Sequence, residues 1–271
     1  MKYVDTLGDA SRPTSDRSLV LNSAAILLDW DGCVMIDDMI VPAARTLMRQ
    51  YAEKIVILSN NSTHLPEDFW RILSRSEVYI SASRIVLAGA EALRWLTRQP
   101  PARIMLFGST RIRCHARLLG LNVVREHPEI VVLMRDTRFT YAKLDRAINA
   151  LHRGARLVVA NGDLTHPGAG ARIVPETGAL LAAVKACVPD VEAMTIGKPG
   201  PFLFERACAV AGVLPQHAVM IGDNPDTDVV GALNYGIHSI LIGPRSTISL
   251  EDLIGSEAEP PTSQAFAARS V

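Results

Sequence analysis

Carboxylates stand at the ends of two short apolar runs of this sequence. Asp29 follows residues 24–28 and Asp223 follows residues 218–221, while Asp31 stands two positions after Asp29. Carboxylate oxygen is a preferred ligand of hard cations such as Mg²⁺, and without a cation three carboxylates in one crevice would repel one another. The pattern therefore indicates a metal site, although Asp29 and Asp31 alone would also fit a strand that ends in an Asx turn.

Groups that can bind an anion occur at two further places. The segment Ser59-Asn60-Asn61-Ser62 follows the apolar run 55–58, and Lys198 lies in Gly197-Lys198-Pro199. Hydroxyl and amide groups, together with backbone N–H groups if a helix follows at Pro66, can donate hydrogen bonds to an anion. Lys198 would supply a positive charge among the carboxylates. By itself the segment 59–62 is more typical of a turn.

The apolar runs indicate the elements that must position these residues. The runs lack alternation and are short, which is typical of strands buried on both faces of a parallel sheet. They lie at 24–28, 55–58, 218–221 and 239–242, and helix-like stretches lie at 43–51, 66–74, 90–98, 178–187 and 202–211. This alternation predicts a doubly wound α/β sheet, in which residues at the carboxyl ends of the strands line one crevice.

The middle of the chain has strands and helices of its own. Strand candidates lie at 104–107, 130–134 and 157–160, separated by helix-like residues 111–119 and 141–153. We therefore expect a catalytic core made of residues 1–83 and 191–271, interrupted by a smaller α/β domain at 84–190. Insertions of this kind often act as lids over a site. Residues 255–271 are expected to form a frayed tail.

Composition excludes several classes of protein. The 271 residues are 48 % hydrophobic and 21 % charged, which rules out a disordered chain. Lys and Arg number 28, as do Asp and Glu, and the basic residues are scattered, so no nucleic-acid partner is expected. No signal peptide or run of roughly 18 apolar residues occurs, so no membrane partner is expected. The four cysteines form no CxxC pair, which fits a reducing cytoplasm, with Cys33 an inert filler.

The ordered motifs resemble a known family. Asp29-Trp30-Asp31-Gly32, Ser59-Asn60-Asn61-Ser62, Gly197-Lys198-Pro199 and the segment 222–228 resemble the four motifs of the haloacid dehalogenase superfamily phosphatases. The insertion resembles the large α/β cap of the subclass that contains pyridoxal phosphate and p-nitrophenyl phosphatases. Four motifs in order are more specific than any single one. The second motif carboxylate, Asp31, places the chain with the phosphatases, because a halide leaving group needs no proton.

The resemblance implies a role for each residue. Asp29 would be the nucleophile that forms an aspartyl-phosphate, and Asp31 would act as acid and then base. Mg²⁺ would bind to Asp29, Asp223 and the backbone carbonyl of Asp31. The phosphoryl oxygens would be held by Ser59, Asn60, Asn61 and Lys198. Asp228 would orient the metal site or Lys198.

The cap is expected to select the substrate. By resemblance, His166 would pack on a pyridine ring, although a loop-capping histidine fits equally well. Arg135 stands where those phosphatases tend to carry an aromatic residue, which would favour a substrate with a second negative group. We expect a magnesium-dependent phosphatase of small phosphorylated metabolites, with pyridoxal 5′-phosphate first and sugar phosphates next. A phosphotransferase or mutase and a non-catalytic phosphate sensor stay open. The resemblance also implies a homodimer formed through the cap.

Overall fold

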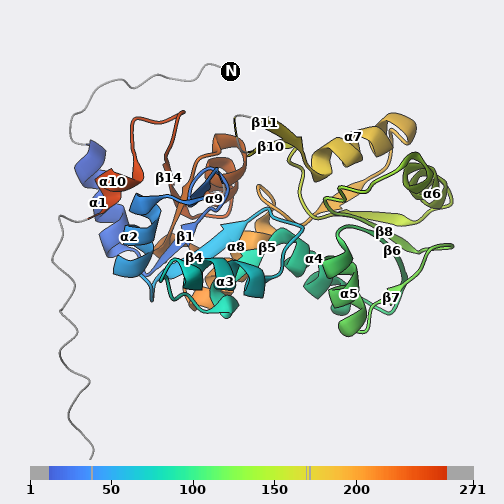
Figure 1. The fold of residues 1–271 in the computed structure, drawn as a ribbon, viewed down its shortest axis with the longest axis horizontal. Helices are drawn as coiled ribbons and strands as arrows, with labels where there is room; N and C mark the ends of the chain where they lie inside the picture. Colours follow the sequence, from blue (N-terminus) through green and yellow to red (C-terminus); the bar gives the residue numbers. More distant parts are fainter. Residues whose placement is uncertain (1–11, 38, 169, 171, 255–271) are drawn as a thin grey trace, which may run out of the picture.

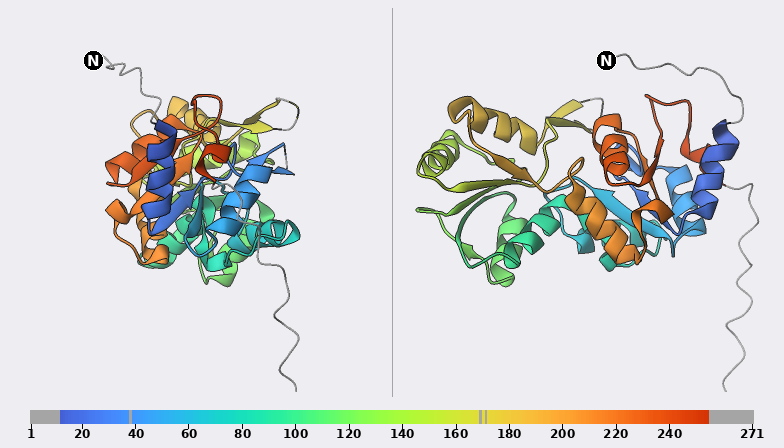
Figure 2. Two further views of the ribbon diagram at one scale, coloured as in Figure 1. Left: turned by 90° about the vertical axis from the view of Figure 1, so that its left-hand side faces the viewer. Right: turned by 180° about the vertical axis from the view of Figure 1, so that it is seen from behind.

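In the computed structural model the chain has two α/β domains that lie side by side (Figure 1). The structure describes residues 12–254 except for 38, 169 and 171, so the expected tail at 255–271 lies outside the described residues. The core domain is at one end of the elongated molecule and the inserted cap at the other, and the chain passes between them at α4 and again before α8 (Figure 2).

The core contains a five-stranded sheet in the order β14-β13-β1-β4-β5, with every pairing parallel. Its strands are β1 (Ala25–Leu28), β4 (Ile55–Ser59), β5 (Ile85–Leu87), β13 (Ala218–Gly222) and β14 (His238–Leu241). From β1 the chain adds β4 and β5 on one side of the sheet, and it later adds β13 and β14 on the other side. The strand order therefore reverses between β1 and β13. Open sheets of this kind bind ligands in the crevice at that point.

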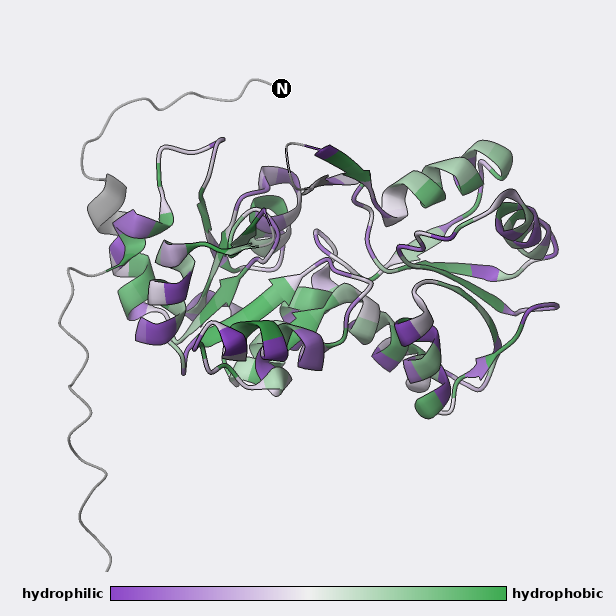
Figure 3. Ribbon diagram, viewed as in Figure 1, coloured by the Kyte–Doolittle hydropathy of each residue, from purple (hydrophilic) through white to green (hydrophobic). Residues whose placement is uncertain are grey.

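Helices cover both faces of the core sheet. Alternate β1 residues point to opposite faces: Ala25 and Leu27 pack on one side, and Ile26 and Leu28 on the other. The second side is covered by α1 (Arg12–Asn22), α2 (Pro42–Gln50), α3 (Pro66–Arg75) and α10 (Leu250–Leu253), and the first by α8 (Pro201–Ala211) and α9 (Val230–Asn234). The strands β1, β4, β5 and β13 are therefore mostly apolar, as Figure 3 shows. The edge strand β14 reads His-Ser-Ile-Leu. The doubly wound α/β fold predicted from the sequence is confirmed.

The cap has its own parallel sheet, in the order β12-β9-β8-β6-β7. These strands are β6 (Arg103–Phe107), β7 (Asn122–Val123), β8 (Ile130–Leu133), β9 (Arg156–Val159) and β12 (Ala193–Thr195). One face packs against α4 (Ala88–Thr97) and α5 (Thr110–Leu118), and the other against α6 (Tyr141–His152) and α7 (Thr177–Cys187). An antiparallel hairpin of β10 (Thr165–Gly168) and β11 (Arg172–Pro175) lies between the two domains (Figure 1).

Sheet membership differs from the expected domain boundaries at both ends of the cap. β5, within the expected cap range 84–190, pairs with β4 in the core sheet. β12, within the expected core range 191–271, pairs with β9 in the cap sheet. Both are three-residue edge strands. β12 reads Ala-Met-Thr and so is not an apolar run, whereas β5 reads Ile-Val-Leu but continues directly into α4. Among the described residues, no helix is long and apolar enough to cross a membrane.

Candidate active site

The predicted polar residues meet in one cavity at the carboxyl ends of the strands. This cavity of about 320 Å³ lies between core and cap. All ten residues selected from the sequence line it: Asp29, Asp31, Ser59, Asn60, Asn61, Arg135, His166, Lys198, Asp223 and Asp228. Asp29 follows β1 and Asp223 follows β13, so the two lie on either side of the reversal in strand order. The parallel register places them together because Leu28 of β1 pairs with Ile221 of β13.

A buried ammonium group lies at the centre of this cavity. Lys198 Nζ lies 2.5 Å from Asp29 Oδ1 and 2.6 Å from Asp228 Oδ1, and it donates a 3.1 Å hydrogen bond to the carbonyl of Leu58. The side chains of all three charged residues are less than a tenth exposed. Burial lowers the pKa of Lys198, but the Asp228 and Asp29 carboxylates outweigh it and raise that pKa above the usual value. Lys198 is therefore a fixed positive charge beside Asp29.

Asp223 and Asp29 form an acidic pair that suits a cation. Oxygen atoms of Asp29, Asp223 and Asp228 lie within 4.8 Å of one another. Burial raises the pKa of Asp223 to about 6, and Asp228 adds to this shift. Burial also raises the pKa of Asp29, against the effect of Lys198. Because a single ammonium contacts two buried carboxylates and the half-buried Asp223 lies beside them, the donor set fits an additional hard cation.

The turn after β1 is shaped around the same acidic pair. Gly32 has a φ of +84°, a conformation that favours glycine. A Cβ atom at this position would collide with the Asp223 carboxylate. Asp31, one residue earlier, faces the open cavity, and the surrounding protein raises its pKa by removing part of its solvation. The Asp-Trp-Asp-Gly motif thus needs its glycine for the approach of Asp223.

Asn60 joins three parts of the site. Its Oδ1 accepts a 2.7 Å hydrogen bond from the backbone N–H of Lys198. Its Nδ2 donates to the carbonyl of Lys198 at 3.1 Å and to Asp163 Oδ2 at 3.0 Å. Both amide protons are used, so this side chain has no donor left for a phosphate. Asn61 Oδ1 accepts from the backbone N–H groups of Thr63 and His64, which closes the turn after β4.

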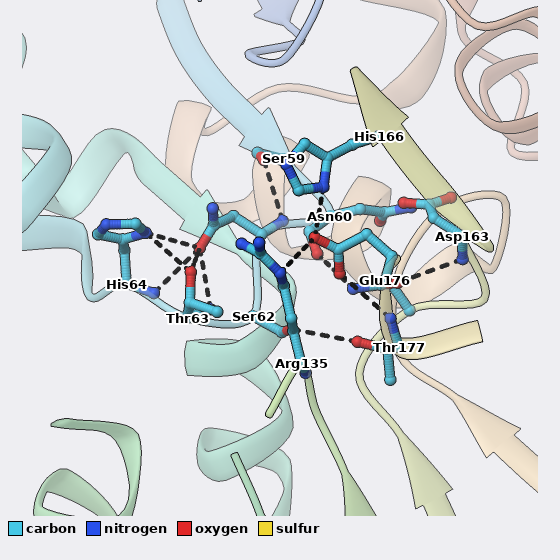
Figure 4. A network of polar contacts seen from close by, with 12 residues as sticks. Ser59, Asn60, Ser62, Thr63, His64, Arg135, Asp163, His166, Glu176 and Thr177 are labelled. Atoms are coloured by element: carbon cyan, nitrogen blue, oxygen red, sulfur yellow. Dashed lines mark hydrogen bonds and ion pairs between the residues drawn. The ribbon is translucent and has the colours of Figure 1, made fainter. Parts of the chain in front are cut away.

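The cap contributes three linked polar side chains to the same cavity as Asp29. Glu176 Oε1 lies 2.9 Å from His166 Nδ1 and 3.4 Å from Arg135 Nε (Figure 4). Its other oxygen, Oε2, accepts a 3.2 Å hydrogen bond from the backbone N–H of Thr177. His166 comes from the hairpin strand β10, and Arg135 follows β8, so Glu176 joins two elements of the cap. The positive charge of Arg135 is balanced within the cap.

Comparison with known proteins identifies the family. The family model for haloacid dehalogenase-like hydrolases matches residues 26–122, and a model described as HAD-hydrolase-like matches residues 195–260. A dihydroxyacetone phosphatase of Corynebacterium glutamicum is 30 % identical over 227 residues, which cover 82 % of this chain and 81 % of the relative. The chain belongs to the haloacid dehalogenase superfamily. It is a phosphatase of that superfamily with an inserted cap, as its motifs indicated.

Solved structures of similar phosphatases share this fold over most of the chain. The 4-nitrophenylphosphatase of Thermotoga maritima superposes with a TM-score of 0.78 at 26 % identity, covering 87 % of this chain and 97 % of that one. A glycerol phosphate phosphatase of Mycobacterium tuberculosis, solved in complex with magnesium, gives 0.74 at 25 % identity and covers 83 % and 69 % of the two chains. None of these three relatives is named for pyridoxal phosphate, so the first substrate expected from the sequence gains no support.

Sequence reasoning missed some residues that line the phosphatase cavity. Asp163, Glu176 and His64 all reach it from loops or element ends. Asp163 and Glu176 are separated from the four motifs in sequence, and their importance depends on contacts with Asn60, Arg135 and His166 that only the folded chain creates. Burial lowers the pKa of His64 and raises that of Glu176, so both are partly desolvated by the cap and core together. No local pattern marks His64, and Glu176 lies in a segment whose resemblance to the family cap assigns it no role.

Proposed function

We propose that this phosphatase hydrolyses small phosphomonoesters whose organic part is uncharged and rich in hydroxyl groups, such as triose, glycerol or other sugar phosphates. The observation that supports this class is the pairing of Glu176 with Arg135 and His166 in the cap. A cap arginine without a partner would attract a second anionic group on the substrate. Here the carboxylate neutralises that charge and leaves hydrogen-bonding groups, which suit hydroxyls. The names of the relatives from Corynebacterium and Mycobacterium agree with this class.

The first proposed step transfers the phosphoryl group to the enzyme. An Asp29 oxygen attacks phosphorus, the bond from phosphorus to the ester oxygen breaks, and an aspartyl-phosphate forms. Asp31 gives its proton to the departing oxygen. The raised pKa of Asp31 favours a protonated carboxyl at the start of the step. Lys198, already beside Asp29, stabilises the negative charge on the phosphoryl oxygens.

The second proposed step returns the enzyme to its starting state. Asp31, now a carboxylate, takes a proton from a water molecule that attacks phosphorus, and the bond from phosphorus to Asp29 breaks to release phosphate. Asp29, Asp223 and the backbone carbonyl of Asp31 would hold Mg²⁺, which when bound supplies charge neutralisation for nucleophile and phosphate. Asp228 keeps Lys198 in place. Asn60 positions the Lys198 loop, and we assign the phosphate contacts to Ser59, Asn61 and Lys198.

Two other functions are less well supported. A non-catalytic phosphate sensor would need neither a nucleophile such as the buried Asp29 nor an acid such as Asp31. A phosphotransferase or mutase would share the aspartyl-phosphate and differ only in the acceptor of the second step. Product analysis separates it from a hydrolase, because a transferase releases little inorganic phosphate unless an acceptor alcohol is absent.

The test is a panel of substrates assayed for phosphate release with and without Mg²⁺. The panel contains dihydroxyacetone phosphate, glycerol 3-phosphate, glucose 6-phosphate, pyridoxal 5′-phosphate and 3-phosphoglycerate, which carries an additional carboxylate. We expect magnesium-dependent release, with the highest kcat/KM among the first three. A preference for 3-phosphoglycerate or pyridoxal 5′-phosphate would contradict the substrate class. No release from any of them would contradict the hydrolase.

The proposed assembly is a homodimer formed through the cap. It rests on resemblance to the capped subclass and is tested by light scattering of the purified protein. A mass equal to one chain across the working concentration range would exclude it.

A further inference from the structure

The cap carries a second cavity, of about 560 Å³, which shares no lining residue with the phosphatase site. The described residues that line it include six cationic side chains and no carboxylate. The cations are Arg113, Arg117, Arg125, Arg138, Lys143 and Arg146. Their positions in the sequence look scattered, and folding gathers them from α5, α6 and the segments after β7 and β8.

Most of this positive charge is not balanced by the protein. Within the described residues, only Lys143 among the six forms a salt bridge, at 2.6 Å from Asp136. The hydrogen bonds of the others go to neutral groups: Arg113 donates to the carbonyl of Gly108 at 2.6 Å, and Arg138 donates to the Thr110 hydroxyl. Cations held together without counter-charges raise the local potential, and a bound anion would lower it.

The cavity exists because the cap sheet has a short edge. β7 pairs with β6 only at Arg103 and Ile104, so residues 105–107 of β6 have no partner strand on that side among the described residues. Met105 and Phe107 line the floor with Val123 and Val124. The floor is therefore apolar and the rim cationic, and the volume lies in the range of small-molecule sites.

We propose that this cavity binds a small ligand with two or more adjacent phosphate groups. Arginine forks bind phosphate oxygens in pairs, and five arginines exceed what a single phosphate needs. The site would be separate from the catalytic one, which holds one buried lysine for one phosphoryl group. It goes beyond the proposed hydrolase function and does not depend on it.

The test uses tripolyphosphate as the probe, titrated calorimetrically into the full chain in buffer without divalent cations. Arg117→Gln with Arg125→Gln removes two exposed cavity cations whose side chains form no hydrogen bond with the described part of the chain. Arg153→Gln with Arg156→Gln is the control, since it removes the same charge from exposed positions in the same domain outside the cavity. Phosphatase activity on dihydroxyacetone phosphate checks that both variants are folded. Hydrogen–deuterium exchange locates the bound probe.

We expect the wild-type protein to bind tripolyphosphate, with protection from exchange in residues 110–126. The cavity variant should bind at least about tenfold more weakly, and the control variant should bind as the wild type does. Absence of binding to the wild type, equal losses in both variants, an unchanged cavity variant, or protection confined to residues 59–64 of the catalytic site would each overturn the proposal.

Discussion

Asp29 and Lys198 form a buried ion pair that the fold could not keep for stability alone. Removing two charges from water costs several kcal/mol, and the attraction between the two charges often does no more than offset that cost. Asp228 and the Leu58 carbonyl complete the contacts of the ammonium, so its orientation is defined by three acceptors. The arrangement makes sense if Asp29 must be held beside a positive charge where a phosphoryl group arrives. These residues could be predicted from the sequence because each lies in a local motif.

Gly32→Ala tests the approach of Asp223 to the turn. The new Cβ atom meets the Asp223 carboxylate, so we expect the Mg²⁺ concentration for half-maximal activity to rise about tenfold or more. Gly120→Ala is the matched control, because Gly120 also has a positive φ, +78°, but no atom lies within 4 Å of a Cβ there. Both variants should lose about 1 kcal/mol of unfolding free energy. Equal Mg²⁺ requirements in the two variants would show that the Asp223 contact is not what matters.

Glu176→Gln tests the neutral character of the cap site. Removing the carboxylate leaves Arg135 uncompensated, so kcat/KM for 3-phosphoglycerate relative to dihydroxyacetone phosphate should rise by about tenfold, or about 1.4 kcal/mol. The exposed Glu192→Gln has the same charge change away from the site and should leave the ratio unaltered. If Glu176→Gln leaves the ratio of the two kcat/KM values unchanged, the cap does not select substrates by their charge.

At the scale of elements, the sheet core was predictable and its edges were not. The runs 24–28, 55–58 and 218–221 became β1, β4 and β13 because strands buried on both faces need continuous apolar residues. β12 was not predicted because its residues, Ala-Met-Thr, form no apolar run, and β5 was not predicted because its Ile-Val-Leu run continues directly into α4. The β10–β11 hairpin was not predicted because it does not pack on an apolar core and so needs no apolar run. Its Ile173 side chain, for example, is 78 % exposed. Its placement of His166 depends on tertiary contacts.

Asn60→Ala tests how β4 is joined to the Lys198 loop and the cap. The substitution removes three hydrogen bonds, each worth about 1 kcal/mol net, so unfolding free energy should fall by about 2–3 kcal/mol. We expect kcat to drop at least tenfold while KM changes little, because Lys198 loses its support. Asn149→Ala, in the exposed part of α6, serves as the control. A higher KM with unchanged stability would instead indicate direct phosphate binding by Asn60.

At the scale of the whole molecule, core and cap share one apolar cluster. It runs from Leu27 and Val56 of the core sheet to Ile104 and Val132 of the cap sheet. Charged contacts cross the boundary too, as between Arg111 Nε and Asp68 Oδ2 at 2.6 Å. The two domains therefore meet through α4, α5 and α8 on one side, and the cavity opens on the other.

The cysteines offer a check on this packing. Cys114 and Cys187 are exposed, whereas Cys33 and Cys208 are buried. Burial raises the pKa of Cys208 to about 11 and also raises that of Cys33, beside the carboxylates. A thiol reagent at neutral pH should therefore modify two cysteines quickly in the native protein, and all four only after unfolding. Peptide mapping that finds rapid modification of Cys33 would contradict the packing and would point to a redox role.

The nucleophilic role of Asp29 is the central claim, and trapping the intermediate tests it most directly. The enzyme is mixed with dihydroxyacetone phosphate and Mg²⁺, quenched in acid within one turnover, and digested for mass spectrometry. We expect a phosphoryl group on the peptide that contains Asp29 in the wild type, and neither adduct nor phosphate release in Asp29→Asn. Phosphate release by Asp29→Asn at a rate near that of the wild type would contradict the account.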